Sequence, residues 1–370
     1  MRPENSLRCA AKALVAIASV AFAAAQAPQI AGANLQQRSA AGGLESTFRS
    51  IVASQATAAW IGYAVPMLAG DHEVCCSDSW NDGNSGSYCG ECRLEAGEGM
   101  NMNSSPHQAD LEGSQALLVF FRVENHAVEK VRVFSEDCQV NAGGRTVYWL
   151  TSVPAAESVA MLASLVAGSG SGLVNADDRD HVSDGAVLAI ALHADPSAER
   201  ALDGFVAPGQ PEKLRERSAF WLGSARGRSG FETLHRLARE DRDDSFREKL
   251  MFDLSISKQP AAVDALIESA RNDSSSKVRG QALFWLSQKA GKKAASAITE
   301  AIEKDPETEV KKRAVFALSQ LPKDQGVPLL IQTARTNSNP AVRKQAMFWL
   351  GQSNDPRALD FFEQVLGQKN

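Results

Sequence analysis

Thiols are the side chains of this sequence best suited to chemistry, and five cysteines gather in one region. They are Cys75, Cys76, Cys89, Cys92 and Cys138. Residues 139–370 contain no cysteine. Clustered thiols support three kinds of site: a disulfide framework, a metal site with four thiolate or imidazole ligands, and a thiol–disulfide redox centre.

The disulfide framework is the interpretation that the pattern favours. A metal site would combine the adjacent and the Cys-x-x-Cys pairs with Cys138 or His72, but this spacing is irregular. A redox centre would use Cys89 and Cys92, yet Glu91 between them disfavours a thiolate, and no thioredoxin-like alternation of strands and helices surrounds the motif. We therefore predict disulfides whose pairing stays open, with one cysteine left over, and neither a metal nor another cofactor.

The N-terminus has the pattern of a secretory signal peptide. Arg2, Arg8 and Lys12 precede an apolar run over 13–25, and small residues follow it. This order is typical of export signals, and the run is shorter than the roughly 20 residues that a membrane helix needs. We predict a cleaved signal peptide over residues 1–27 and a bacterial protein of the periplasm or the extracellular space. Such oxidising compartments favour disulfides.

The composition is that of an ordinary globular protein with a mildly acidic balance. Hydrophobic residues make up 44% and charged residues 22%, and the formal net charge is −5. No basic footprint is present, so we predict that nucleic acid is not a partner. No later stretch is long and apolar enough to span a bilayer, so we predict no membrane span after signal cleavage. The oligomeric state stays open.

Residues 57–152 have the pattern of a small antiparallel β domain. Four short apolar runs are bounded by turn residues, at 60–66, 117–123, 128–134 and 145–150. The polar loop from 69 to 112 carries four of the cysteines, and a loop of this length requires covalent or functional support. Residues 28–56 are predicted to form a linker or a short helix.

A period of 32 residues organises the C-terminal half. Phenylalanine recurs at this spacing, at Phe220, Phe252, Phe284, Phe316 and Phe348. A basic residue precedes each of them in the same register, at Arg215, Arg247, Arg279, Lys311 and Arg343. Aspartate or asparagine also keeps the register, at Asp241, Asp273, Asp305 and Asn337. A fixed period of this size indicates a solenoid.

Each unit is predicted to contain two helices. Helix A, represented by 278–288, is apolar around more than half of its circumference and must be covered from several sides. Helix B, represented by 260–272, is amphipathic and leaves one face for solvent or a partner. We predict about six units over 182–370, preceded by a capping helix and linker over 153–181. The predicted fold class is α+β, an α-solenoid preceded by a cysteine-containing antiparallel β domain.

The beginning of helix A resembles the HEAT-repeat family, in the short form found in phycobilisome-lyase-like repeats. The shared pattern is Val-Arg-x-x-Ala-x-x-x-Leu followed by Gly or Ser. It occurs at Val278, Arg279, Ala282, Leu286 and Ser287, and at Val342, Arg343, Ala346, Leu350 and Gly351. The resemblance covers 182–370 and implies a solenoid whose aspartate and arginine ladders tie adjacent turns. It also implies a lyase as a further alternative, although chromophore lyases with such repeats act inside cells.

The repeated aromatic and basic residues are expected to have structural roles. We predict that the phenylalanines pack in the core between repeats, and that each basic residue bonds the preceding aspartate or a loop carbonyl. The outer face of helix B is the better candidate for binding. Its register positions carry long polar side chains of mixed character: Arg236, Glu268, Glu300, Gln332 and Gln364.

These observations predict an exported, non-enzymatic protein that binds or scaffolds a protein or peptide through the helix B face of the array. The alternative from a different class is an enzyme, a thiol–disulfide oxidoreductase that uses Cys89 and Cys92. The redox state of these two cysteines separates the two hypotheses, because a redox enzyme needs a reactive pair and a stapled domain needs a closed disulfide.

Overall fold

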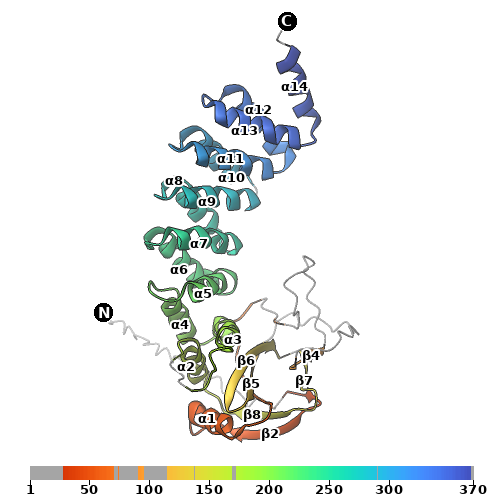
Figure 1. Cartoon of the computed structure of the whole chain (residues 1–370), viewed down its shortest axis with the longest axis vertical. Helices are drawn as coiled ribbons and strands as arrows, with labels where there is room; N and C mark the ends of the chain where they lie inside the picture. Colours follow the sequence, from red (N-terminus) through yellow and green to blue (C-terminus); the bar gives the residue numbers. More distant parts are fainter. Residues whose placement is uncertain are drawn as a thin grey trace, which may run out of the picture.

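The computed structural model describes residues 28–70, 74, 91–95, 115–136, 138–168, 172–289 and 291–367. Its fold is α+β, as predicted: a base that contains the strands carries a long array of helices, which ends at α14 (Figure 1). The predicted signal peptide lies outside these residues. In the part of the chain that the structure describes, no helix is both long and apolar enough to cross a membrane.

A mixed sheet of five strands forms the centre of the base, in the order β2-β8-β3-β5-β6. The strands are β2 (Asn34–Ser39), β8 (Thr146–Thr151), β3 (Ala59–Pro66), β5 (Ala116–Glu124) and β6 (Ala127–Ser135). The four predicted strands correspond to β3, β5, β6 and β8. Strands β3, β5 and β6 are antiparallel, whereas β8 runs parallel to both β3 and β2. The prediction of an antiparallel domain is therefore wrong for this edge, because turn signals identify hairpins and not pairs that are distant in sequence.

The segment 28–56 contains more than the predicted linker or short helix. It forms helix α1 (Leu44–Ser54), which buries Leu44 and Phe48, and the edge strand β2. The β2 sequence, NLQQRS, is largely exposed and shows no alternation of apolar and polar residues. Polar edge strands of this kind resist pairing with other chains, and they also give no strand signal in the sequence.

Both faces of the large sheet are covered. On β5, Leu117 and Phe121 belong to the main core, which includes residues of α1, α2 (Ala155–Val166) and α3 (Arg179–Leu192). Phe120 faces the other way, into a second core that includes Cys92. A small parallel sheet contributes to this second core, with strands β1 (Ile30–Ala31), β7 (Gln139–Asn141) and β4 (Glu91–Arg93). Burial on both faces explains why the β5 sequence is a continuous apolar run.

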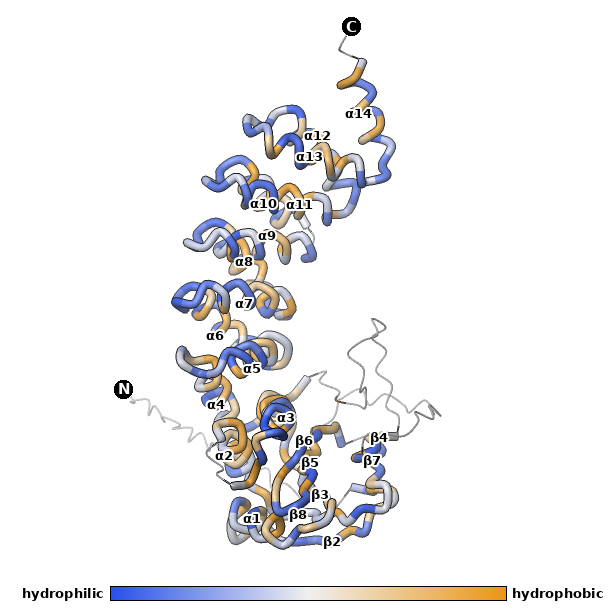
Figure 2. The backbone as a smooth tube through the Cα atoms, viewed as in Figure 1, coloured by the Kyte–Doolittle hydropathy of each residue, from blue (hydrophilic) through white to orange (hydrophobic). Residues whose placement is uncertain are grey.

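The predicted C-terminal array of helical repeats is confirmed, and its helices α3 to α14 follow one another in pairs. The pairs are α3 with α4 (Ser197–Phe205), α5 (Glu212–Ser224) with α6 (Gly227–Glu240), α7 (Asp244–Ile256) with α8 (Ala262–Asn272), α9 (Ser276–Lys289) with α10 (Lys292–Lys304), α11 (Thr308–Gln320) with α12 (Lys323–Thr336), and α13 (Pro340–Gln352) with α14 (Pro356–Gly367). Odd-numbered helices are helix A of each unit and even-numbered helices are helix B. Neighbouring helices of the same kind pack on each other, so the array has two layers. Apolar residues concentrate between the layers (Figure 2).

The array is joined to the base where α3 crosses β6. Gly185 of α3 lies so close to this strand that a Cβ atom there would stand 2.2 Å from the backbone oxygen of Val131. Only glycine permits this approach of helix to strand. The close contact fixes the first unit on the sheet, and the following units stack from it.

A buried polar network reinforces the same joint. The hydroxyls of Tyr63 in β3 and Ser158 in α2 are 2.7 Å apart, and His193 Nε2 at the end of α3 is 2.9 Å from Ser158 Oγ. The other ring nitrogen, Nδ1, is 3.0 Å from the backbone oxygen of Ala189. All three side chains are fully buried. Burial lowers the pKa of His193 to about 4, so the imidazole is neutral in the folded protein near pH 7.

This histidine predicts a stability change in mild acid. The pKa of an unfolded histidine is about 6.5, so folding opposes protonation between about pH 6.5 and pH 4. The unfolding free energy of the wild type should fall by about 1.4 kcal/mol per pH unit in this window, relative to His193→Gln. Urea unfolding of both proteins at pH 7, 5.5 and 4.5 measures the difference. Parallel curves would contradict the neutral buried imidazole.

Candidate functional site

A buried arginine joins each central unit to the next. In α7, Arg247 donates to the Asp273 carboxylate at 2.8 and 2.9 Å and to the backbone oxygen of Asp241 at 2.6 Å. One repeat later, Arg279 donates to the Asp305 carboxylate at 2.7 and 3.2 Å and to the backbone oxygen of Asp273 at 2.9 Å. The hydrogen bonds that they donate to the carboxylates raise the pKa of both guanidinium groups. Each bridge therefore fixes three segments of chain with one side chain.

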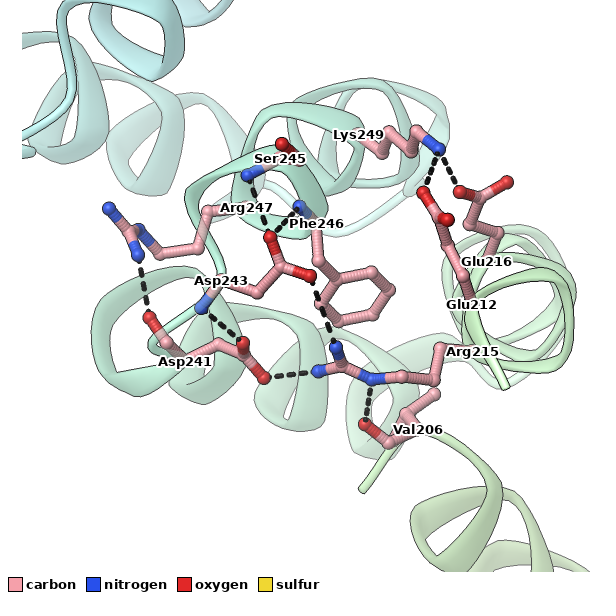
Figure 3. A network of polar contacts seen from close by, with 10 residues as sticks. All are labelled: Val206, Glu212, Arg215, Glu216, Asp241, Asp243, Ser245, Phe246, Arg247 and Lys249. Atoms are coloured by element: carbon pink, nitrogen blue, oxygen red, sulfur yellow. Dashed lines mark hydrogen bonds and ion pairs between the residues drawn. The ribbon is translucent and has the colours of Figure 1, made fainter. Parts of the chain in front are cut away.

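The carboxylate that each arginine bonds differs from the predicted one. The carboxylate belongs to the aspartate that follows each arginine by 26 residues, whereas the preceding aspartate contributes its backbone oxygen. In the first bridge, Arg215 pairs with Asp241, donates to the backbone oxygen of Val206 at 3.1 Å and lies 3.7 Å from the ring centroid of Phe246 (Figure 3).

The last two basic residues of the register bond only to carbonyls. Lys311 donates to the backbone oxygen of Glu303 at 2.8 Å, and Arg343 donates to that of Asn337 at 2.8 Å. Asparagine in place of aspartate at position 337 explains why the ion pair stops here. The row of arginine bridges thus has a structural role, and its ion pairs are made by arginines of α5, α7 and α9.

The five phenylalanines lie at the surface edge of the helix A layer and not in its core. Four of them are half-buried, and Phe348 is 53% exposed. The neighbouring leucines of the same motif, such as Leu222 and Leu286, occupy the buried position. The prediction that the phenylalanines pack in the core between repeats is therefore wrong, because the leucines occupy that place.

These rings form a continuous row with Trp285 and Trp349, two of the three tryptophans that directly follow a phenylalanine. Phe220 stacks on Phe252 with centroids 6.3 Å apart, and Phe284 stacks on Phe316 at 6.0 Å. Trp285 connects the two pairs, with centroids 4.9 Å from Phe252 and 4.9 Å from Phe284. We use the name aromatic ladder for Phe220, Phe252, Trp285, Phe284, Phe316, Trp349 and Phe348.

A groove of about 660 Å³ opens at the end of the aromatic ladder nearer to the base, along α5, α7 and α9. Phe220 and Phe252 line it together with carboxylates from both neighbouring helices. Lys249 bridges two of these, Glu212 at 2.9 Å and Glu216 at a shorter distance (Figure 3). The carboxylates of this groove thus already hold one ammonium group.

Asp253 is the unusual residue of the groove. It stands in the register position that tryptophan occupies in three units and alanine in two, and it is only 4% exposed. In the described part of the chain, nothing donates a hydrogen bond to its carboxyl group. Burial, with a contribution from the charge of Glu216, raises the pKa of Asp253 to about 8.

The charge along the helix A layer changes sign from one end to the other. The residues four positions before the ladder register, from α3 to α13, are Asp184, Glu216, Glu248, Gly280, Lys312 and Lys344. Acidic groups thus flank the row of rings at the end nearer to the base, and basic groups flank it at the far end. The 32-residue register brings these side chains into one line, which the single sequence motifs do not reveal.

Three of the five predicted helix B positions bond to a side chain of the preceding helix B. Glu268 Oε2 is 2.8 Å from His235 Nε2, and Arg271 donates to Glu300 at 2.6 Å. Arg335 donates to Gln364 at 2.6 Å. Arg236, Gln332 and Gln364 are exposed. This face is therefore a network of polar side chains between repeats, with three exposed positions among the five.

The cysteine region is described only in part. Cys75, Cys76 and Cys89, as well as His72, lie outside the described residues. Cys92 is disulfide-bonded and fully buried, and Cys138 is a buried thiol whose sulfur is 3.3 Å from the backbone oxygen of Val74. The extent and pairing of the disulfide framework remain predictions, and so does the metal alternative.

Comparison with known proteins agrees with the repeat assignment. Residues 295–370 match a family model described as HEAT repeats. A comparison with curated proteins gave no match. Among solved structures, a chain of the CpcE–CpcF complex of phycocyanin lyase from a Nostoc species is 22% identical, with a TM-score of 0.32, over 42% of this chain and 99% of that one.

Two further solved structures are similar at lower identity. Human deoxyhypusine hydroxylase is 18% identical over 59% of this chain and 86% of its own, with a TM-score of 0.25. YibA of Escherichia coli is 13% identical over 57% of this chain and 76% of its own, with a TM-score of 0.33.

The arginine bridge makes a prediction about the stability of the array. Arg279→Met leaves Asp305 buried and uncompensated, which should lower the unfolding free energy by roughly 3–5 kcal/mol. The loss should appear as faster amide hydrogen exchange in α9 to α12. The double variant Arg279→Met, Asp305→Asn should recover part of it, and Lys293→Met, which breaks the exposed pair with Asp264, should change little. Equal effects of the two single variants would refute the bridge.

For Asp253 we expect the opposite effect, a gain in stability when the residue is replaced. Its pKa is about 8 in the folded protein against about 3.9 when unfolded, so ionisation destabilises the fold as the pH rises between these values. Asp253→Asn should therefore be more stable than the wild type at pH 7, and the difference should grow by about 1.4 kcal/mol per pH unit between pH 5 and 7. Urea unfolding at these pH values measures it, with the exposed Asp264→Asn as control. A wild type that equals Asp253→Asn at both values would contradict the buried acid.

Proposed function

We propose that this chain is an exported, non-enzymatic HEAT-repeat protein that binds or scaffolds a protein or peptide, and that the partner covers the aromatic ladder. The observation that carries the proposal is the continuous row of partly exposed rings from Phe220 to Phe348. Aromatic side chains dominate the centres of protein interfaces, and solenoids present extended surfaces to their partners.

The helix A layer is a better binding surface than the helix B face that the sequence favoured. On helix B, Glu268 and Glu300 are already held by His235 and Arg271 of the preceding unit. A partner would have to displace these pairs, and exposed ion pairs contribute little free energy to an interface. The aromatic ladder instead offers apolar area that loses contact with water when it is covered. The helix B face remains the alternative surface.

Export is supported by the pattern of the first 27 residues, and a disulfide at Cys92 agrees with an oxidising compartment. The same cysteine gives no support to the oxidoreductase alternative. A redox sulfur must meet the disulfide of its substrate, and Cys92 is fully buried beneath the large sheet. The lyase alternative has no site residue that favours it in the described part of the chain.

Photo-crosslinking in the cells that make the protein tests the proposal. p-Benzoylphenylalanine would replace Phe284 or Phe316 on the aromatic ladder and, in matched variants, the exposed Gln332 or Arg236 on helix B. We expect a discrete adduct with a partner at the ladder positions and none on helix B, because the crosslinker reacts only within contact distance. Adducts at helix B alone would move the binding surface to that face. No adduct at any of the four positions would refute partner binding by the array.

A further inference from the structure

The groove at the base end of the aromatic ladder has features of a site for a cation. Four carboxyl groups line it, from Glu212, Glu216, Glu248 and Asp253, and the one cation among its lining residues is Lys249. Acidic clusters on protein surfaces are common, so charge alone identifies no ligand. The second observation is Asp253, whose carboxyl group is buried in the groove wall without a hydrogen-bond donor from the described chain.

The ionised form of this carboxyl group is unfavourable for the fold unless a cation compensates its charge. Burial and the negative charge of Glu216 both disfavour the carboxylate. Packing does not require a carboxyl group at position 253, because the same register position holds tryptophan in other units, at Trp221 and Trp285. A donor that enters from outside would satisfy the carboxyl group and compensate the charge.

The aromatic lining narrows the choice of cation. Phe220 and Phe252 are stacked 6.3 Å apart, with an angle of 16° between their planes, and they line the same groove as the carboxyl groups. A guanidinium group is planar, lies flat on aromatic rings and donates hydrogen bonds in a fork that matches a carboxylate. The array already uses this combination once, where Arg215 lies over Phe246 and pairs with Asp241. A compact, strongly hydrated ammonium group uses such a surface less well.

We propose that the groove binds an arginine side chain of the partner, which packs against Phe220 and Phe252 and bonds to the carboxyl group of Asp253, with Glu248 and the Lys249-bound Glu216 as additional counter-charges. This inference rests on the proposed function, because it assigns the chemistry of the partner that covers the aromatic ladder. The partner segment is basic where it meets α5 and α7 and apolar along the remaining rings. The lysines at positions 312 and 344 disfavour a second basic group at the far end of the ladder.

Binding of two synthetic peptides to the full exported chain tests the assignment. Both are fluorescein-labelled, alternate leucine with a second residue, and differ only in whether that residue is arginine or citrulline, its neutral isostere. We expect fluorescence anisotropy to give at least a tenfold lower Kd for the arginine peptide. The double variant Glu216→Gln, Glu248→Gln should remove most of this preference. The double variant Glu268→Gln, Glu300→Gln on helix B loses the same charge and should keep it, which separates the groove from general electrostatic attraction.

Proton release on binding tests the role of Asp253, because a purely structural role of this residue would not change it. An arginine that pairs with it favours the ionised carboxyl group, so binding at pH 7 should release a proton. Calorimetry in two buffers of different ionisation enthalpy measures this release, which Asp253→Asn should abolish. The other charged groups facing Asp253 are Glu212 and Glu216 from α5 and Glu248 and Lys249 from α7, while Gln281 from α9 is neutral. Asp253→Asn retains the side-chain shape, so folding of the variant is preserved.

The outcomes separate this inference from the proposed function. If both peptides bind with equal affinity and Phe284→Ala weakens both, the aromatic ladder binds a partner but the groove does not select arginine. A lysine version that binds as tightly as the arginine peptide would overturn the guanidinium assignment. Absence of binding by either peptide at millimolar concentration would overturn the site, whereas the crosslinking experiment would still decide partner binding.

Discussion

The central part of the array depends on one interaction, the buried bridge from an arginine of helix A to an aspartate in the loop that follows helix B of the same unit. Arg247 and Arg279 each connect this carboxylate with a backbone carbonyl in the loop that follows the preceding unit. The same aspartates also accept hydrogen bonds from backbone amides two residues later, as Asp273 does from Ser275. The guanidinium therefore fixes loop conformation and unit spacing together. Since a buried charge without its partner is strongly unfavourable, a shift of one residue between α5 and α10 would break a bridge.

This fixed spacing explains the surface row of rings. A residue that recurs every 32 positions must lie at the same place on every helix A, and the bridges keep those helices parallel in one layer. The leucine of each motif then faces the core, whereas the phenylalanine two positions earlier lies at the edge, where it can reach only the ring of the next unit. The charged side chains four positions before the phenylalanines lie along the same line. The change from acidic to basic residues along this line therefore belongs to the whole surface and not to any single unit.

The repeat architecture could be predicted from the sequence because its signal is local and repeated. The period, the six units and the four apolar strands all follow from spacing and alternation. Three features could not be obtained in this way. The parallel pairing of β8 with β2 and β3 depends on contacts remote in sequence. The half-exposed phenylalanines look like core residues, because a helix A with an apolar arc wider than half a turn gives no sign of which edge meets solvent. Finally, the groove needs Asp253 and Glu216 from different units, which only the stacking brings together.

At Asp253, the residue type that would favour folding differs from the one that would favour binding of a cation. An apolar residue at its position is compatible with the packing, as Trp285 shows one unit later, where the indole continues the row of rings. The aspartate interrupts that row and places a carboxyl group in a wall where its ionised form is unfavourable. In the unliganded protein this residue contributes nothing that the fold requires. A cation bound beside it would remove the penalty of ionisation, so the stability lost in the empty groove becomes affinity for the partner in the filled one. Selectivity for a cation then arises from the unfavourable state of the empty site, because a neutral side chain of the same shape can donate a hydrogen bond but does not compensate the charge of the carboxylate.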